Sequence, residues 1–236
     1  MKFIFFLTVA LVVSAKGSFI EDIFNLPTDV LSVIPLTNDS TSPVYCNDAA
    51  LSFCQYQFDV AAGIATTNTW RTGNDFLKAI LTVLGNSDVG GLLKVCQARQ
   101  AFNDCLGSQY SACVNTYHLI GETNAGENIG DAYTYVATYA ELDFICNEGL
   151  GIAISSWKQL SALDGSKAAL ACHAIFQTGM ATNPGNMCGY ADQYAKCLQG
   201  VFNTRAGFGD GWWKCELIRN GFAKYCSNTC TLTSSP

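Results

Sequence analysis

Cysteine is the residue type with the clearest capacity for chemistry in this chain of 236 residues, which has 12 cysteines and only two histidines. No C-x2-C pair occurs, so the ligand spacing of a zinc site is missing and disulfide bonds are favoured over metal. An even number of cysteines in a secreted chain is typical of a disulfide framework. We predict up to six bridges, with connectivity left open, through Cys46, Cys54, Cys96, Cys105, Cys113, Cys146, Cys172, Cys188, Cys197, Cys215, Cys226 and Cys230.

Two segments, 96–106 and 188–198, share the pattern C-x8-C-L with an aromatic residue three positions before the second cysteine. If each segment is a helix, its two cysteines are about 900° and about 13.5 Å apart, whereas the Cα atoms of a disulfide lie within about 7 Å. The cysteines within each segment therefore should not pair, and each helix should be tied to two neighbours. Cys215 and Cys226, eleven residues apart, should likewise have separate partners. The repeated pattern also suggests two related halves.

The other reactive residue types form no recognised catalytic pattern. The chain has no G-x-S-x-G, H-E-x-x-H, Walker or G-x-G-x-x-G motif. Residues 155–158 (SSWK) match S-x-x-K, but the companion motifs S-D-N and K-T-G are absent. We interpret His118 and His173 as structural residues. The expectation is a protein that is not an enzyme, with no catalytic residue, no metal site and no cofactor.

Carboxylates offer two further candidates. Glu141 and Asp143 flank one residue of a predicted helix, so they should point about 200° apart rather than act as a pair. Glu122, Glu127 and Asp131 surround a glycine-rich loop and could hold calcium through oxygen ligands, but they lack the EF-hand order. We favour solvated loop acids, with Asp131 available to cap the helix that follows.

Three tyrosines, Tyr133, Tyr135 and Tyr139, lie on one predicted helix. Tyr135 and Tyr139 are four residues apart and share a face. They could line a pocket for an apolar ligand or stack on sugar rings. We favour the alternative that they pack in the core with their hydroxyl groups at the surface.

The elements that position these residues are predicted to be helices. Apolar residues recur at intervals of three and four, and no segment shows the alternation of a strand. The sequence therefore predicts an all-α, disulfide-braced bundle of seven or eight helices. The expected helices span approximately residues 46–61, 74–84, 88–106, 133–146, 150–163, 167–176, 188–202 and 212–226.

The amino-terminal region indicates export. Residues 1–15 combine Lys2, an apolar run and a small-residue ending, which is typical of a signal peptide cleaved after Ala15 or, alternatively, Gly17. Residues 16–45 form a predicted extended leader rich in proline, serine and threonine, with a glycosylation sequon at Asn38. Residues 46–236 form the helical domain. No later segment has about 18 uninterrupted apolar residues, so no membrane span is expected.

The composition narrows the range of partners. Charged residues make up only 14% of the chain, against about 25% in typical domains. Without Lys2 the chain has 12 basic and 19 acidic residues, a net charge of −7, which disfavours nucleic acid and anionic membranes. With 49% hydrophobic residues the chain can bury an ordinary core, which the disulfides would reinforce.

The order of the cysteines, with 143–146 (DFIC) ending one helix and C-x8-C-L at 188–198 beginning a later one, resembles secreted helical cysteine-rich proteins of invertebrates. It is most similar to the insect haemolymph glycoprotein family and to nematode secreted cysteine-rich families. The resemblance covers residues 46–230 and implies an extracellular, mostly helical protein without catalytic residues. The predicted function is a structural or interaction component of an extracellular fluid or matrix, with a protein or matrix partner. The alternative is an extracellular carrier of small apolar ligands.

Overall fold

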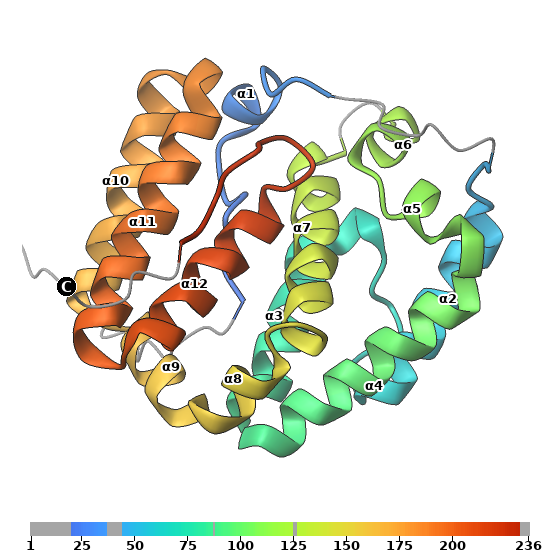
Figure 1. Cartoon of the computed structure of the whole chain (residues 1–236). Coiled ribbons are helices and arrows are strands. Elements are labelled where there is room, and N and C mark those ends of the chain that lie inside the picture. Colours follow the sequence, from blue (N-terminus) through green and yellow to red (C-terminus); the bar gives the residue numbers. More distant parts are fainter. Residues whose placement is uncertain (1–19, 37–43, 87, 125–126, 232–236) are drawn as a thin grey trace, which may run out of the picture.

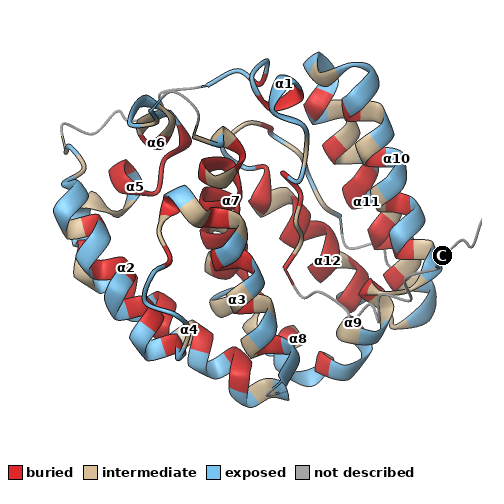
Figure 2. Ribbon diagram, turned by 180° about the vertical axis from the view of Figure 1, so that it is seen from behind, coloured by how far each residue is buried: buried red, intermediate tan, exposed pale blue. Residues whose placement is uncertain are grey.

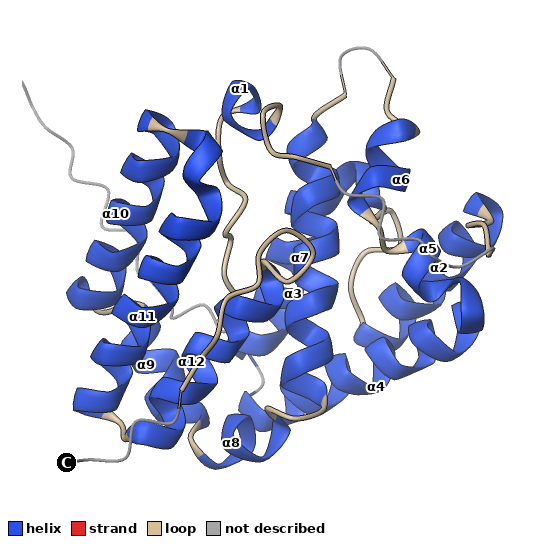
Figure 3. Cartoon of the chain, turned by 45° about the horizontal axis from the view of Figure 1, so that its top comes forward, coloured by secondary structure: helices blue, strands red, loops and turns tan. Residues whose placement is uncertain are grey.

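The computed structural model describes residues 20–36, 44–86, 88–124 and 127–231, and in these ranges the chain is helical with no strand (Figure 3). Eight helices in the described part have eight or more residues, which confirms the predicted all-α class. The α-helices are α1 Thr28–Leu31, α2 Asp48–Ala62, α3 Gly73–Asn86, α4 Asp88–Leu106, α5 Tyr110–Cys113, α6 Thr116–Gly121, α7 Ile129–Cys146, α8 Leu150–Ser155, α9 Trp157–Asp164, α10 Lys167–Thr182, α11 Met187–Arg205 and α12 Phe208–Gly221.

The helix ends follow from local chemistry. The Asn47 side chain accepts hydrogen bonds from the first backbone N–H groups of α2, and Gly63 ends that helix in the left-handed conformation at φ 68°. Gly107, at φ 50°, likewise separates α4 from the short helix α5. The segment predicted as one helix over 150–163 is divided at Ser156 into α8 and α9. Gly207, at φ 127°, lies between α11 and α12, whereas Gly209 and Gly211 lie within α12.

Helix α7 is the centre of the fold. Figure 1 shows it between α2, α3 and α4 on one side and α10, α11 and α12 on the other. Figure 2 shows buried residues on most of its surface, in contrast to the outer helices, which are exposed on one side. A helix covered from all sides needs apolar or hydrogen-bonded residues around its whole circumference, which explains its run of tyrosine, alanine and threonine.

Residues 20–36 belong to the same core. They carry only the short helix α1, but Ile20, Ile23 and Phe24 are buried. The ring of Phe24 lies 5.2 Å from that of Tyr133 and 5.3 Å from that of Phe222. Within the described residues, the segment 20–36 is therefore part of the packed core, although the longer helices begin only with α2.

Six disulfides join all twelve cysteines. The two cysteines of each C-x8-C-L segment bond to different partners, as the helical geometry predicts. On α4 these bridges are Cys54–Cys105 and Cys96–Cys146, and on α11 they are Cys172–Cys197 and Cys188–Cys226. Cys215 bonds to Cys230, and Cys46 to Cys113.

The bridging order is the same at both ends of the chain. In each half, a cysteine before the segment bonds to its second cysteine, and a cysteine after the segment bonds to its first. The aromatic residue of each segment is buried and stacked on another ring: Phe102 on Tyr139 and Tyr194 on Phe176. The shared pattern of bridges and rings supports the description of two related halves.

Candidate functional site

A buried lysine on α12 lies among several ionisable side chains. Lys214 has no solvent exposure, and its Nζ lies 2.5 Å from Glu21 Oε1 and 2.6 Å from Asp164 Oδ1. Tyr194 donates a hydrogen bond of 3.0 Å to the other oxygen of Glu21. We call Glu21, Glu141, Asp164, Tyr194 and Lys214 the Lys214 cluster. A buried ammonium group is tolerated only with such counter-charges around it, so these contacts fix the leader against α9, α11 and α12.

The acids of this cluster outnumber its single cation. Glu141 Oε2 accepts a 2.9 Å hydrogen bond from the Glu21 backbone N–H, while its Oε1 has no hydrogen-bond partner among the described residues. Burial raises the pKa of Glu141 well above its ordinary value. Burial also raises the pKa of Asp164 to about 7, although Lys214 opposes the shift. Burial alone would lower the pKa of Lys214, but Asp164 and Glu21 outweigh it and raise that pKa.

A second buried carboxylate lies between α2 and α7. Asp59 accepts a 2.8 Å hydrogen bond from Gln55 Nε2, and Gln55 Oε1 accepts hydrogen bonds from Tyr135 and Tyr139 at 2.7 and 2.9 Å. Burial raises the pKa of Asp59 to about 6, against the opposing effect of hydrogen bonds from Gln55 and Asn68. This network gives the α2–α7 contact a polar centre within an aromatic core.

The tyrosines of α7 pack in the core. The ring of Tyr139 stacks on Phe102 at 4.4 Å and on Phe76 at 5.4 Å, and Tyr133 and Tyr135 are equally buried. The predicted core packing is correct, but the expectation of hydroxyl groups at the surface is wrong for all three. The buried hydroxyl groups are hydrogen-bonded, because Gln55 of α2 accepts from Tyr135 and Tyr139, and the Leu31 carbonyl oxygen of α1 accepts from Tyr133.

Both histidines have partners within the fold. His118 Nε2 lies 3.1 Å from Asp48 Oδ1, and His173 Nδ1 lies 3.3 Å from the Tyr194 hydroxyl group. Potential ligand atoms of Cys46, Asp48 and His118 lie within 4.8 Å of one another. The sulfur of Cys46 is bonded to Cys113, however, so it is not a thiolate and cannot act as the third ligand of this group.

Near the glycine-rich loop, the carboxylates of Glu127 and Asp131 are engaged by other protein groups, whereas Glu122 is contacted only at its backbone carbonyl oxygen. Arg71 stacks on Trp70 at 4.0 Å, pairs with Glu127 at 3.1 Å and donates to the Glu122 carbonyl oxygen. Asp131 accepts two 2.9 Å hydrogen bonds from Asn74, from the backbone N–H and from the side chain.

The expectation that Asp131 caps the helix that follows it is therefore wrong. Asp131 caps the first turn of α3, and Asn128 caps α7 by accepting from the Gly130 N–H. The cause is the close packing of the two helices, which brings the start of α3 within reach of the first turn of α7.

The pair Glu141 and Asp143 is splayed as predicted. Glu141 points into the Lys214 cluster, whereas Asp143 accepts hydrogen bonds from Arg99 Nε at 2.5 Å and from the Tyr110 hydroxyl group at 2.9 Å. The two carboxylates serve different contacts and do not face a common space.

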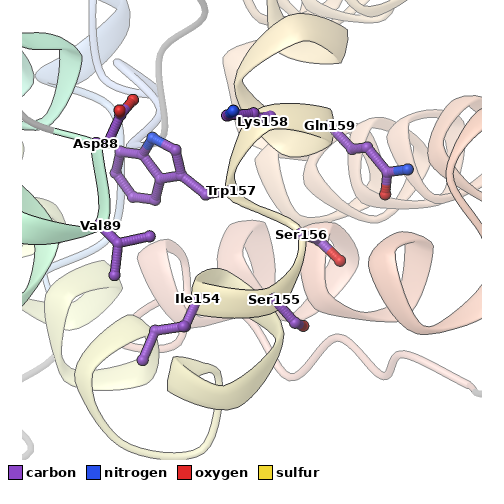
Figure 4. A pocket seen from close by; sticks show the side chains of 8 residues that line it. All are labelled: Asp88, Val89, Ile154, Ser155, Ser156, Trp157, Lys158 and Gln159. Atoms are coloured by element: carbon purple, nitrogen blue, oxygen red, sulfur yellow. The ribbon is translucent and has the colours of Figure 1, made fainter.

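The SSWK segment lines a half-open cavity of about 440 Å³ where α8 and α9 meet the start of α4. Figure 4 shows that the side chains of Ser155 and Ser156 point to a different side from that of Lys158. Ser155 Oγ instead donates to the Ile152 carbonyl oxygen at 3.2 Å. A nucleophilic serine needs its base within hydrogen-bonding distance, so this arrangement does not form a serine–lysine catalytic pair.

Sequence reasoning did not identify the Lys214 cluster. Its members come from the leader, α7, α9, α11 and α12, and Glu21 is 173 residues from Tyr194. The one local signal is a lysine between Trp213 and Cys215, a position that the apolar neighbours mark as interior. The glycosylation candidate Asn38 and the predicted signal peptide 1–15 lie outside the described residues.

Comparison with protein-family models, curated proteins and solved structures finds no match for this chain. The resemblance to invertebrate cysteine-rich proteins therefore stays a prediction from the order of the cysteines. No helix in the described ranges is long and apolar enough to cross a membrane.

Proposed function

We propose that this chain is a secreted, non-enzymatic protein that serves as a structural or interaction component of an extracellular fluid or matrix. The observation that carries the proposal is the set of six disulfides, which leaves no free cysteine. Such a framework persists in oxidising compartments and is rare in the cytosol. Bridges that close loops of 15 to 67 residues are each worth about 3 to 4 kcal/mol, which suits a protein that must endure outside the cell.

The buried ionisable groups support a non-catalytic role. Lys214 and Glu141 have no solvent exposure, so a substrate has no direct access to them. Asp59 is equally enclosed by α2 and α7. In each case the acids satisfy other groups of the same chain, as expected of interactions that hold helices together.

Expression of the full chain in secretory cells tests the proposal. The expected product appears in the medium, begins after Ala15 or Gly17, and is lighter than its reduced form by two hydrogens for each of the six disulfides. Recovery from an insoluble matrix, or with one protein partner, would support the interaction role. Retention inside the cell with free thiols would overturn the proposal.

The alternative, a carrier of small apolar ligands, has one observation in its favour. The tyrosines of α7 leave no room for a ligand, but the cavity beside α8 has a volume within the range of small-molecule sites. Val89, Ile154 and Trp157 form its apolar lining. Native mass spectrometry of the secreted chain should then show a bound adduct that Ile154→Asp removes, and the bare mass alone would exclude the carrier.

A further inference from the structure

Helix α2 presents a large hydrophobic stripe to solvent. Phe53, Tyr56 and Val60 are 57%, 52% and 56% exposed, and their spacing places them on one face of the helix. Figure 2 shows α2 at the edge of the molecule with exposed residues on its outer side. Contiguous exposed apolar patches of this size on folded chains are often functional surfaces.

The same face has no charge between its ends. The exposed residues of α2 after its first residue are Ala49, Ser52, Phe53, Tyr56, Gln57, Val60 and Ala61. A membrane-bound helix would carry lysine and arginine beside its apolar residues, and this one carries none. The chain as a whole has a net charge of −6, so two copies repel each other except where they meet through an uncharged surface.

We infer that α2 pairs with the α2 helix of a second copy in an antiparallel, two-fold arrangement. The stripe is symmetric about the point between Tyr56 and Gln57. A two-fold axis at this point places Phe53 opposite Val60 of the second copy, and the reverse, with both Tyr56 rings beside the axis. A large residue thus faces a smaller one at each contact, which gives the self-complementary surface of a two-fold interface.

The two ends of α2 also favour the antiparallel orientation. Asp48 is the first residue of the helix, and the Lys94 ammonium group of α4 lies against Gly63 at the other end. Antiparallel pairing brings the acidic end of one copy to the basic end of the other and opposes the two helix dipoles. Parallel pairing would place like charges together.

The size of the surface predicts reversible association. Each of the three stripe residues has about half of its surface exposed, so together they bury roughly 300 Å² per copy. When both copies and the small residues that flank the stripe are counted, the total buried area is roughly 1,000 Å². This value lies just below the range of stable interfaces. The inference rests on the proposed interaction role, for which it names a second copy as the partner. It predicts a dissociation constant between about 1 and 500 μM.

Sedimentation velocity on the secreted, disulfide-intact chain between about 1 and 500 μM tests the pairing, since these concentrations span the expected dissociation constant. The wild type should shift from monomer to dimer. Phe53→Lys and Val60→Glu should each weaken dimerisation at least about tenfold, because each places a charge against an apolar side chain. Leu170→Lys, at a position on α10 that is 51% exposed, is the matched control and should leave the dimer unchanged.

Mixing the two α2 variants tests the register. In a mixed dimer, the new ammonium group at position 53 of one copy faces the new carboxylate at position 60 of the other, so the mixture should dimerise more tightly than either variant alone. A wild type that stays monomeric at all concentrations, or no rescue on mixing, would overturn this inference. A secreted protein that stays monomeric would contradict the pairing through α2 but not the proposed function. An intracellular dimer with free thiols would contradict the proposed function but not the pairing.

Discussion

Raising the pH from 5 to 8 should destabilise this protein. Burial raises the pKa of Asp164 to about 7 and that of Asp59 to about 6, from an ordinary value of 3.8. Over this range the folded chain therefore holds protons that the unfolded chain has released. Because the folded state binds more protons, its stabilising contribution is complete at low pH and is lost as the pH rises through the folded pKa values.

The size of the destabilisation follows from the pKa shifts, because each group changes the free energy of unfolding by about 1.4 kcal/mol per pH unit between its unfolded and folded pKa values. Between pH 5 and its folded pKa, Asp164 loses about 3 kcal/mol of stabilisation, and Asp59 loses about 1 kcal/mol. The raised pKa of Glu141 acts in the same direction. A total of about 4 kcal/mol is a large share of the 5 to 15 kcal/mol typical of a folded domain.

Urea unfolding followed by circular dichroism, with the disulfides intact, measures this dependence at half-unit intervals of pH. Asp164→Asn keeps the shape of the protonated acid, so it should reduce the slope of the curve over the whole range from pH 5 to 7. Asp59→Asn should flatten the curve between pH 5 and 6. Glu127, whose pKa is lowered by hydrogen bonds from Asn124, acts oppositely and only in more acidic solution.

A wild-type stability that stays constant or increases from pH 5 to 8 would refute the reasoning. So would an Asp164→Asn variant with the slope of the wild type, since another group would then bind the proton.

Three further perturbations test the packing. In thermal unfolding, Gly73→Ala should lower the stability by several kcal/mol, because a Cβ there would lie 2.0 Å from the Asp131 carbonyl oxygen on α7. Gly85→Ala is the control. A Cβ at that position has no atom within 4 Å, so this variant should be neutral or slightly stabilising. Lys214→Met should cost about 3 to 5 kcal/mol at pH 7 by leaving Glu21 and Asp164 without their cation, and less at pH 5, where Asp164 is protonated. Replacing Cys172 and Cys197 together by serine should cost about 3 to 4 kcal/mol in urea, as expected for a bridge that closes a 25-residue loop.

Each of these three predictions can be contradicted by a specific result. Equal stability of the two glycine variants would mean that α3 and α7 are not in close contact. If Lys214→Met lowered the free energy of unfolding equally at pH 5 and pH 7, the lysine would not be stabilised by the charge of Asp164. A cysteine variant as stable as the wild type would show that α10 and α11 are held by side-chain packing alone.

Much of the secondary structure could be predicted because it depends on near neighbours. Apolar residues at intervals of three and four mark helical faces, and asparagine before α2 and glycine after it mark its ends. The division at Ser156 escaped prediction because the apolar pattern continues through it. The pairs of cysteines that cannot bond could also be excluded, because nine residues of helix put two sulfurs on opposite faces.

The direction of a site residue could be predicted only where it depends on the geometry of a single helix. The splayed directions of Glu141 and Asp143 follow from helical rotation alone. The partner of Asp131 does not, because its carboxylate accepts hydrogen bonds from Asn74 at the start of α3, a helix that is distant in the sequence. The exposure of Phe53, Tyr56 and Val60 also could not be predicted, since α2 has apolar residues on both its inner and outer faces.

The helical class, the side of each helix that carries its cysteines and the oxidation of those cysteines in pairs could all be predicted from the amino-acid sequence alone. The pairing of the cysteines could not be predicted in this way, nor could the ion pair between Glu21 of the leader and Lys214 near the other end of the chain. The difference lies in the separation along the sequence of the residues that interact. Helical periodicity is set within one or two turns, whereas a bridge or a buried ion pair depends on which faces pack together, and many packings satisfy the same local pattern.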